Sequence, residues 1–423
     1  MLDINFIKEN KEVVARAIEQ KGIDLNLDKL LELDIKRREL ILKVDGLRRE
    51  RNEAAQKRDI ETGKALKLEL DTWEIELKEA QERFEHMMLY VPNIPSEDSP
   101  IGKDSSFNKE IFEWGQKFDF KFTPKSHVDI AKNLGIVDFE MGTKVSGFRG
   151  YYLKGQGALL HLAILNYAVQ KITQSGFTLM IPPTLVHEKV LVGSGQFPFG
   201  KDNIYQISNP GKIETGQDIS NPVYLVGTSE PSLLGYFADR IVSEEELPIK
   251  VAGISSCYRS EVGDYGRDTK GLYRVHEFSK VEQVVICRNN LEESEAIFKE
   301  MQSISESILQ ELNIPYHVIA TSTGDMGAGK YRMNDIEAWM PGRGSFGETH
   351  SNSNLTDWQA RRLNLKFKTK AGEVAHCYTL NNTVIASPRI LIAILENFQQ
   401  EDGSVIIPEA LRPFTGFDKI ANP

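Results

Sequence analysis

The segment from about residue 27 to 91 constrains the fold of this chain most, because it holds no proline and only two glycines. It is rich in Leu, Glu, Lys and Arg, a composition typical of long helices. Within the segment, residues at alternating spacings of four and three would line one side of a helix. Such a line of residues forms a seam that faces a partner helix. One seam runs through Leu66, Leu70, Trp73, Leu77, Ala80, Phe84 and Met87, and an earlier one through Leu33, Arg37, Leu40, Val44, Leu47, Arg51 and Ala54.

The segment Asp59–Gly63 separates the two seams and is the predicted point of chain reversal, because glycine tolerates the positive φ needed just after a helix end. Two helices of about 30 residues each would form an antiparallel arm on the order of 45 Å long. The prolines of Val91–Pro95 then end the arm. Periodicity alone leaves open whether this arm is a coiled coil for dimerisation or binds another partner.

The charge of the chain is unevenly distributed. A net charge of -10 argues against nucleic-acid binding, which needs positive charge. The stretch 36–58 has the opposite balance, with four acidic residues (Glu39, Asp45, Glu50 and Glu53) against nine basic ones: Lys36, Arg37, Arg38, Lys43, Arg48, Arg49, Arg51, Lys57 and Arg58. The first helix of the arm is therefore expected to carry a basic face.

Length and composition indicate an ordinary packed protein. The 423 residues, of which 40% are hydrophobic and 26% charged, suggest two domains and no disorder. The start of the chain lacks a signal-like pattern and no run is apolar enough to span a bilayer, so we expect a cytoplasmic protein without membrane contact. Cys257, Cys287 and Cys377 have neither disulfide nor zinc spacing and are predicted to be buried free thiols.

After about residue 120, β-like runs alternate with amphipathic helical stretches, which predicts an α/β or α+β domain. Neither a Gly-x-Gly-x-x-Gly run after a strand nor a Gly-x-x-x-x-Gly-Lys-Ser/Thr loop is present. A nucleotide would therefore have to bind without either common phosphate cradle.

The run Cys257–Phe278 places charged residues where a hairpin should have core residues. An apolar strand leads into Arg259-x-Glu261, a Gly-rich loop follows, and a second apolar strand begins near Val275. The Arg259 guanidinium is suited to a phosphate or carboxylate, and Glu261 can accept from an amino group. An isolated Arg-x-Glu pair is more often a salt bridge than a site.

Two further runs have a similar character. Ser387-Pro388 is a predicted helix start, with the Ser387 hydroxyl as cap, which leaves Arg389 in a first turn that favours a bound anion. Ser175–Pro183 reads as a helix end, a turn and a proline-ended strand, which alone carries little information.

Together these runs resemble the three motifs of the class II aminoacyl-tRNA synthetases, and the chain is similar to the seryl-tRNA synthetase family over nearly its whole length. The resemblance implies an α+β fold: a catalytic domain on an antiparallel β-sheet flanked by helices, with an N-terminal antiparallel two-helix coiled-coil arm. It implies an N-terminal tRNA-binding domain over 1–100, with the arm at about 27–91, and a catalytic domain over 101–423. Motifs 1, 2 and 3 would occupy about 160–186, 251–282 and 378–400, and motif 1 would form a homodimer interface.

The resemblance also implies roles in ATP binding. Arg259 would hold the α-phosphate and the serine carboxylate, Phe278 would stack on the adenine, and Glu261 would meet its amino group. Arg274 would reach the far phosphates, Arg389 would clamp the γ-phosphate, and the loop from Gly263 to Leu272 would guide the end of the tRNA. The complete expected ATP site is Arg259, Ser260, Glu261, Arg274, Val275, Phe278, Glu348, Thr349, His350, Ser351 and Arg389, with Arg259 and Arg389 as the catalytic residues.

The expected serine site follows from the same resemblance. Thr228 and Glu230 of Thr228-Ser229-Glu230 would receive the α-ammonium, while Glu282 would accept from the substrate hydroxyl. The full expected set is Thr228, Ser229, Glu230, Arg259, Glu282, Asn381 and Thr383. Glu348 and Ser351 would offer oxygen ligands to Mg²⁺ bound with ATP, and His350 would serve packing; no zinc is expected.

The implied activity is that of a serine–tRNA ligase, which forms seryl-adenylate from L-serine and ATP and transfers serine to the 3′ end of tRNA(Ser). The resemblance leaves tRNA(Sec) open as a second substrate. Two alternatives are an amino-acid ligase that serves a carrier protein and a noncatalytic relative. The first is expected to lack the arm and the second to have lost a site residue, and neither loss is found in this sequence.

Overall fold

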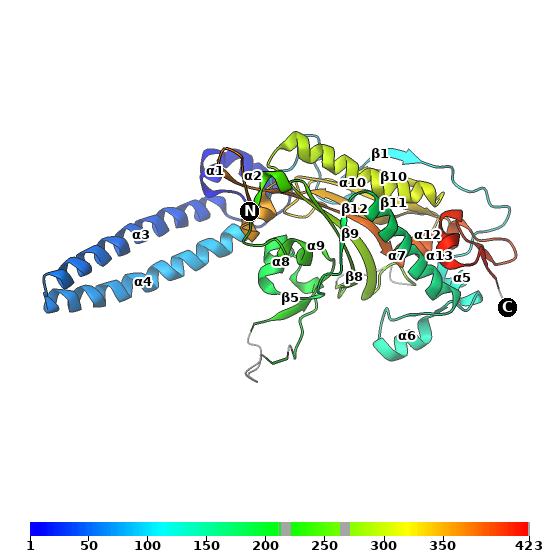
Figure 1. Cartoon of the computed structure of the whole chain (residues 1–423), viewed down its shortest axis with the longest axis horizontal. Helices are drawn as coiled ribbons and strands as arrows, with labels where there is room; N and C mark the ends of the chain where they lie inside the picture. The colour runs from blue at the N-terminus through cyan, green and yellow to red at the C-terminus, as the bar shows by residue number, and fades with distance from the viewer. Residues whose placement is uncertain (210, 213–220, 263–270, 422–423) are drawn as a thin grey trace. The chain divides into compact units, whose positions relative to one another are not determined.

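The structure is a computed structural model that describes residues 1–209, 211–212, 221–262 and 271–421 (Figure 1). It consists of two compact units, Met1–Ile94 and Pro95–Pro423. No helix among the described residues is long and apolar enough to cross a membrane.

The first unit is helical throughout. Two short helices, α1 (Ile4–Glu9) and α2 (Lys11–Gln20), precede two helices of 30 residues each, α3 (Leu27–Gln56) and α4 (Ile60–Leu89). The side chain of Asn26 caps α3 by accepting from the backbone N–H of Lys29. Helices α3 and α4 pack against each other as an antiparallel pair, which confirms the predicted arm.

The seam between α3 and α4 is apolar in its middle and polar toward the end near α1. Its buried side chains are Leu30, Asp34, Leu40, Val44, Leu47 and Ala54 on α3 and Leu70, Ala80, Phe84 and Met88 on α4. Buried Asp34 forms ion pairs with Lys8, Arg37 and Arg38. Burial works against ionisation of this carboxyl, but its hydrogen bonds to Lys8 and Arg37 outweigh burial and lower its pKa.

The predicted position of the reversal is wrong by a few residues. Helix α3 ends at Gln56, and Arg58, with a φ of 57°, takes the left-handed conformation that was assigned to a glycine. Asp59 then caps α4 by accepting from the N–H of Thr62, so Gly63 lies inside the first turn of α4. The cap explains the difference, since an aspartate at this position satisfies a free helix N–H whereas a glycine cannot.

The second unit is built on an eight-stranded sheet, as the α+β prediction requires. Neighbouring strands are antiparallel throughout, except that β4 is parallel to β8. In order across the sheet, the strands are β1 (Lys109–Trp114), β10 (Tyr316–Ala320), β11 (Arg332–Met340), β12 (Ser345–Asn354), β15 (Tyr378–Ser387), β9 (Glu277–Cys287), β8 (Ile249–Tyr258) and β4 (Thr178–Met180).

Helices and small sheets surround this sheet. The other helices are α5 (His127–Asn133), α6 (Phe139–Ser146), α7 (Gln156–Gln174), α8 (Glu188–Ser194), α9 (Glu230–Gly235), α10 (Leu291–Glu311), α11 (Trp358–Leu363), α12 (Arg389–Asn397) and α13 (Arg412–Thr415). The remaining strands pair as β14 (Val374–His376) with β13 (Lys366–Lys368) and β7 (Ile241–Ser243), β16 (Val405–Ile406) with β17 (Lys419–Ile420), β2 (Val137–Asp138) with β3 (Tyr152–Leu153), and β5 (Leu185–His187) with β6 (Val223–Leu225).

The alternation of side chains along β9 separates the core from the site. Val281 and Val285 belong to the main core, which α7, α10 and α12 cover. Glu282 and Val284 face the other side, where Val284 joins a smaller cluster with α9 and α11. Because alternate residues of a strand share a face, Phe278, Lys280 and Glu282 point to that second side. The three cysteines are buried and free, as predicted.

Candidate active site

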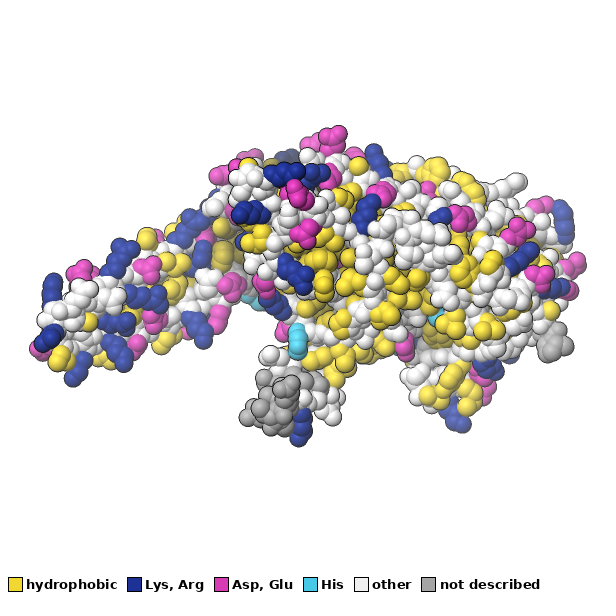
Figure 2. Space-filling model, viewed as in Figure 1, with side chains coloured by type: hydrophobic (Ala, Val, Ile, Leu, Met, Phe, Trp, Pro, Cys, Tyr) yellow, Lys and Arg dark blue, Asp and Glu magenta, His cyan; other side chains and the backbone are white. Residues whose placement is uncertain are grey.

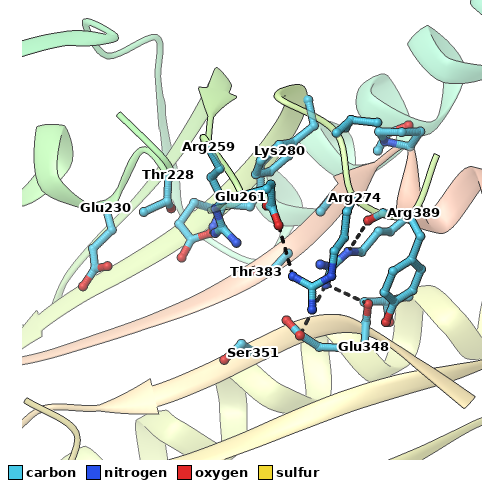
Figure 3. Close-up of a pocket in the computed structure, with 18 of the residues that line it drawn as sticks. Thr228, Glu230, Arg259, Glu261, Arg274, Lys280, Glu348, Ser351, Thr383 and Arg389 are labelled. Carbon is cyan, nitrogen blue, oxygen red and sulfur yellow. Dashed lines mark hydrogen bonds and ion pairs between the residues drawn. The ribbon is translucent and has the colours of Figure 1, made fainter. Parts of the chain in front are cut away.

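A pocket on the second side of the sheet gathers most of the predicted site residues. The predicted residues that line it are Thr228, Glu230, Arg259, Glu261, Arg274, Val275, Phe278, Glu282, Glu348, Thr349, Ser351, Asn381, Thr383 and Arg389. They come from segments that are far apart in sequence: the start of α9, the hairpin of β8 and β9, strands β12 and β15, and the start of α12. Figure 3 shows the charged members around a common space.

Three predicted residues do not line the pocket. Ser229 is fully buried, and its hydroxyl donates to the carbonyl of Gly253. The Ser260 hydroxyl donates to the carbonyl of Asp202. His350 is buried between strands, with Nε2 3.1 Å from the carbonyl oxygen of Val384, and burial lowers its pKa to about 4. A neutral, buried His350 fits the expected packing role.

Arg259 follows β8 directly and is held from both sides. Its backbone N–H donates to the carbonyl of His276 across the hairpin, and its side-chain Nε donates to the carbonyl of Gly227 at 3.2 Å. The guanidinium lies 5.3 Å from the centre of the Phe278 ring. With Nε engaged, the terminal nitrogens of the guanidinium are presented to the pocket. Such a fixed fork suits a phosphate or carboxylate.

Glu261 lies between two arginines. Its Oε2 atom is 3.1 Å from Arg274 and 3.6 Å from Arg149, and its side chain is 7% exposed. Its φ of 51° is uncommon for a residue other than glycine, and such backbone strain is frequent at functional sites. The Glu261 carboxylate, which is predicted to meet adenine, therefore neutralises Arg274, which is predicted to meet phosphate (Figure 3).

Arg389 lies at the start of α12 and links this helix to Tyr273 in the predicted motif 2. It donates to the carbonyls of Tyr273 and Glu348 at 3.1 and 3.2 Å, and it is 3.3 Å from the Glu348 carboxylate. Burial alone would raise the pKa of Glu348, but the nearby guanidinium groups of Arg389, Arg259 and Arg274 outweigh it and lower the pKa. Glu348 is therefore a carboxylate at neutral pH.

The helix start before Arg389 differs from the prediction. Ser387 remains the last residue of β15, paired with Ser279, and its hydroxyl is 2.8 Å from Nδ1 of His161. Pro388 occupies the N-cap position, and no side chain caps α12. The predicted hydroxyl cap is wrong because the strand extends to Ser387. A first turn without a side-chain cap leaves its N–H groups available to an anion.

A β-bulge turns the predicted metal ligands toward the same side. On the partner strand, Ile336 pairs with His350 and Glu337 with Glu348, so β12 has one extra residue at Thr349. Without the bulge, Glu348 and Ser351 would face opposite sides, since they are three positions apart. Both line the pocket, as does Thr349.

The oxygen donors at this bulge fit a magnesium ion delivered with ATP. Among the described residues, no three His, Cys, Asp or Glu side chains are grouped to hold a metal by themselves. Mg²⁺ commonly uses one or two protein oxygens together with substrate phosphates and water. The carboxylate of Glu348 and the hydroxyl of Ser351 are donors of that kind.

The opposite end of the pocket is a network of hydrogen-bonding side chains. Oε1 of Glu230 accepts from Nδ2 of Asn381 at 2.7 Å and from Nε2 of Gln359 at 2.6 Å. Thr383 on β15 is directly opposite Glu282 on β9. The Glu282 side chain is almost fully buried, and its neighbour Lys280 lies 2.5 Å from it. This end combines two carboxylates with amide and hydroxyl groups, as a small polar amino acid requires.

Sequence reasoning missed several lining residues. Lys280 could have been found, because it alternates with Phe278 and Glu282 on one strand. Tyr273, Ser353 and Ala386 lie close to predicted residues but have no distinctive chemistry in the sequence. Gln196 and Lys330 come from loops, where no periodicity marks the inward side. The expected tRNA-guiding loop lies outside the described residues over positions 263–270.

Comparison with known proteins shows the family of the chain. Residues 1–95 match the model of the seryl-tRNA synthetase N-terminal domain, and residues 212–398 match that of the tRNA synthetase class II core domain (G, H, P, S and T). Serine–tRNA ligases of Rubrobacter xylanophilus and Borreliella afzelii are 41% and 43% identical to the chain, with 99% of each chain covered.

Solved structures give the same result. The seryl-tRNA synthetase of Pyrococcus horikoshii complexed with ATP is 37% identical, covers 100% of both chains and has a TM-score of 0.88. The cytoplasmic serine–tRNA ligase of Naegleria fowleri in complex with AMP is 30% identical, covers 100% of this chain and 99% of its own, and has a TM-score of 0.87. The chain belongs to the seryl-tRNA synthetase family of class II aminoacyl-tRNA synthetases.

Proposed function

We propose that this chain activates L-serine with ATP and transfers the serine to tRNA(Ser) in the pocket described above. The observation that carries the proposal is that one cavity joins an arginine-rich end to an end made of carboxylate, amide and hydroxyl groups. The first suits a triphosphate and the second a small amino acid with a hydroxyl. Family membership supports the same reaction.

In this proposal, Arg259 binds the α-phosphate together with the serine carboxylate, because its terminal nitrogens face the pocket. Arg274 exchanges its partner Glu261 for the far phosphates, which frees that carboxylate to accept from the adenine amino group. Phe278 supplies a flat apolar surface for the base. Arg389 holds the γ-phosphate at the start of α12, where helix N–H groups also favour an anion.

Glu348 and Ser351 would hold Mg²⁺ through their oxygens. Bound with ATP, the ion would neutralise phosphate charge and favour departure of pyrophosphate. The contribution of this chain is to keep Glu348 ionised, through Arg389, and to turn both donors to one side, through the bulge at Thr349.

At the other end, Thr228 and Glu230 would accept from the α-ammonium, and Asn381 fixes Glu230 in place. Glu282 would accept from the substrate hydroxyl, with Thr383 opposite it. Alanine lacks that hydroxyl and would leave the buried carboxylate without one of its hydrogen-bond donors. Sites built to bind a hydroxyl reject such analogues strongly, by roughly 10⁴-fold or more in favourable cases.

The chemistry then needs position and charge more than a dedicated base. A serine carboxylate oxygen attacks the α-phosphorus, the bond from that phosphorus to pyrophosphate breaks, and seryl-adenylate forms. A ribose hydroxyl of the tRNA 3′ end next attacks the seryl carbonyl, and AMP leaves. In this proposal, Arg259 stabilises the charge on the α-phosphate in both steps.

The arm is proposed to bind the tRNA. Near the turn between α3 and α4, Arg49, Lys57 and Arg58 are exposed, and within the described chain none of them forms an ion pair. Figure 2 shows basic side chains around this end of the helix pair. Unpaired cations on a rigid helical rod suit the sugar-phosphate backbone of a structured RNA, which is recognised mainly by its shape.

Charge reversal of Arg49, Lys57 and Arg58 to Glu tests this part of the proposal. We expect tRNA affinity to fall, with pyrophosphate exchange unchanged. The slope of log affinity against log salt concentration should become shallower by about 0.7–0.9 for each lost phosphate contact. Lys299→Glu, exposed on α10, is the matched control. Unchanged tRNA binding by the triple variant would refute the assignment. The same assay with a tRNA(Sec) transcript tests that substrate separately.

A homodimer is the proposed assembly. Leu159, Leu162 and Ile181 of the predicted motif 1 region are apolar and well exposed, Ile181 to 85%. Figure 2 shows hydrophobic side chains over and beside α7. Exposed apolar patches mark interaction sites, and most soluble oligomers consist of identical chains. Because translation consumes the product, the proposal also places the enzyme in the cytoplasm.

A further inference from the structure

Lys280 and Glu282 form a buried charged pair inside the pocket that the reaction outlined above does not explain. They are two positions apart on β9, and both side chains point to the pocket side. Their charged groups are 2.5 Å apart, and the side chains are 7% and 3% exposed. A buried ammonium is unfavourable unless it is paired, so the position of Lys280 needs a reason.

The pair lies next to the groups assigned to the substrate hydroxyl. Glu282 is directly opposite Gly253 on β8 and Thr383 on β15, so neighbouring strands enclose it on both sides. The close approach at Gly253 is strict, since a Cβ there would be 2.8 Å from the Ser229 hydroxyl. With 3% of its side chain exposed and Lys280 2.5 Å away, the Glu282 carboxylate has little freedom to turn away from the pocket.

Burial and Glu230 disfavour the charged form of Glu282, and Lys280 is the main group that favours it. Burial raises the pKa of Glu282, and Lys280 is the strongest opposing influence. Glu230 on α9 adds to the increase, and Lys330, from the loop before β11, opposes it more weakly than Lys280 does. The nearby Cys257 thiol is itself buried, which raises its pKa and keeps it neutral.

A substrate hydroxyl donates more strongly to a carboxylate than to a neutral carboxyl group. A protonated Glu282 would also present its own donor, and a hydroxyl would then no longer be required of the substrate. We propose that Lys280 is a specificity-determining residue of the serine pocket, whose ammonium holds Glu282 as a carboxylate turned toward the substrate hydroxyl. This inference rests on the proposed function.

The test compares Lys280→Met, which removes the charge but keeps the length, with Lys280→Arg, which keeps the charge. Serine-dependent ATP–pyrophosphate exchange is measured between pH 6.5 and 9, with separate KM values for serine and ATP. Lys250→Met is the control, because Lys250 on the adjacent strand β8 forms a 2.5 Å pair with Glu300 of α10 and does not line the pocket.

For Lys280→Met we expect the KM for serine to rise roughly tenfold at pH 7, with the KM for ATP nearly unchanged. The loss should grow toward low pH. Binding needs the ionised carboxyl, and without Lys280 that carboxyl takes up a proton at higher pH, so the acid limb of the profile should move upward by about one pH unit. Lys280→Arg should retain most of the affinity, and Lys250→Met should behave like the wild type.

A second measurement separates specificity from general damage. Binding of seryl- and alanyl-sulfamoyl adenosine, two stable analogues of the adenylates, is compared for each variant. We expect Lys280→Met to weaken the seryl analogue selectively. Equal weakening of both analogues, or a serine KM that stays within about twofold of wild type at every pH, would overturn the inference.

Two outcomes keep the inference distinct from folding defects and from the proposed function. If Lys280→Met shows no cooperative thermal unfolding, a double-mutant cycle is measured instead. It introduces Lys280→Gln into the wild type and into the Glu282→Gln variant. Loss of charge at position 280 should then matter only when Glu282 is present, and equal effects in both backgrounds would refute the coupling. Absence of serine-dependent exchange in the wild type would instead reject the proposed function.

Discussion

Replacing Arg389 by Met should separate ATP binding from serine binding. In the structure, the guanidinium donates to the carbonyls of Tyr273 and Glu348 and pairs with the Glu348 carboxylate at 3.3 Å. Methionine retains much of the apolar length of the side chain but makes none of these contacts. The substitution therefore removes the link between α12 and the predicted motif 2, together with one cation of the arginine-rich end of the pocket.

The size of the effect follows from these contacts. A hydrogen bond from a charged group contributes roughly 1.5–3 kcal/mol, and the pocket is open to water, so we take the lower end for the two carbonyl bonds combined. The ion pair adds less than about 1 kcal/mol, because Glu348 is 44% exposed. The free energy of unfolding should fall by about 2 kcal/mol. Loss of one preorganised donor to developing charge typically lowers kcat by about 10²–10³-fold.

The pH dependence of this variant has a definite sign. Arg389 is the main influence that lowers the pKa of Glu348 against burial, so the substitution should raise that pKa. A carboxyl whose pKa is lowered on folding stabilises the protein above its unfolded pKa, and that contribution is lost as the pH falls through the folded pKa. The proposed site also needs Glu348 ionised. The variant should therefore lose exchange activity at a higher pH than the wild type when the solution is acidified.

The assay is ATP–pyrophosphate exchange with the two substrates varied separately, together with chemical denaturation. We expect a large loss in kcat/KM for ATP and a KM for serine within a few-fold of wild type. Arg288→Ala is the control, because Arg288 forms a 2.7 Å pair with Glu293 on the surface of the same unit. If Arg389→Met leaves ATP kinetics intact, or if Arg288→Ala has the same effect, the assignment of Arg389 is refuted.

Three further changes test other parts of the molecule. Deletion of Thr349 should remove the bulge and turn Glu348 from the pocket. Magnesium-dependent exchange should then fall by about 10²-fold or more in steady-state assays. Calorimetry should still detect serine binding. Ile181→Asp should produce monomers in light scattering if motif 1 forms the dimer interface, and an unchanged mass would exclude that surface. Burial lowers the pKa of His317, but Glu337 and Glu110 outweigh burial and raise it. His317→Gln should therefore reduce the free energy of unfolding more at pH 6 than at pH 9. An equal loss at both pH values would contradict the pairing of His317 with the two glutamates.

The arm shows what sequence periodicity can and cannot predict. The heptad spacing predicts two long antiparallel helices, because burial of one seam depends only on the order of residues. The turn is less predictable. Glycine favours a helix end at Gly63, yet Asp59 caps α4 and Arg58 takes the left-handed conformation. The local hydrogen bond of the cap outweighs the conformational freedom of glycine.

The pocket shows a similar division. Motif resemblance identified residues from separate segments that the fold brings together, such as Glu282 and Thr383 on adjacent strands. The bulge at Thr349 and the extension of β15 to Ser387 depend on pairing with distant strands, so no local pattern in the sequence reveals them. Lys280 was missed for another reason, because a lysine in the polar first half of a strand suggests a solvent-facing position.

The most direct test of the central proposal is ATP–pyrophosphate exchange with each of the twenty amino acids, with Glu282→Ala as the companion variant. The account predicts exchange with serine, little with alanine or threonine, and a loss of serine-dependent exchange when Glu282 is replaced. Exchange that does not depend on serine, or full serine-dependent exchange by Glu282→Ala, would contradict the assignment of this pocket.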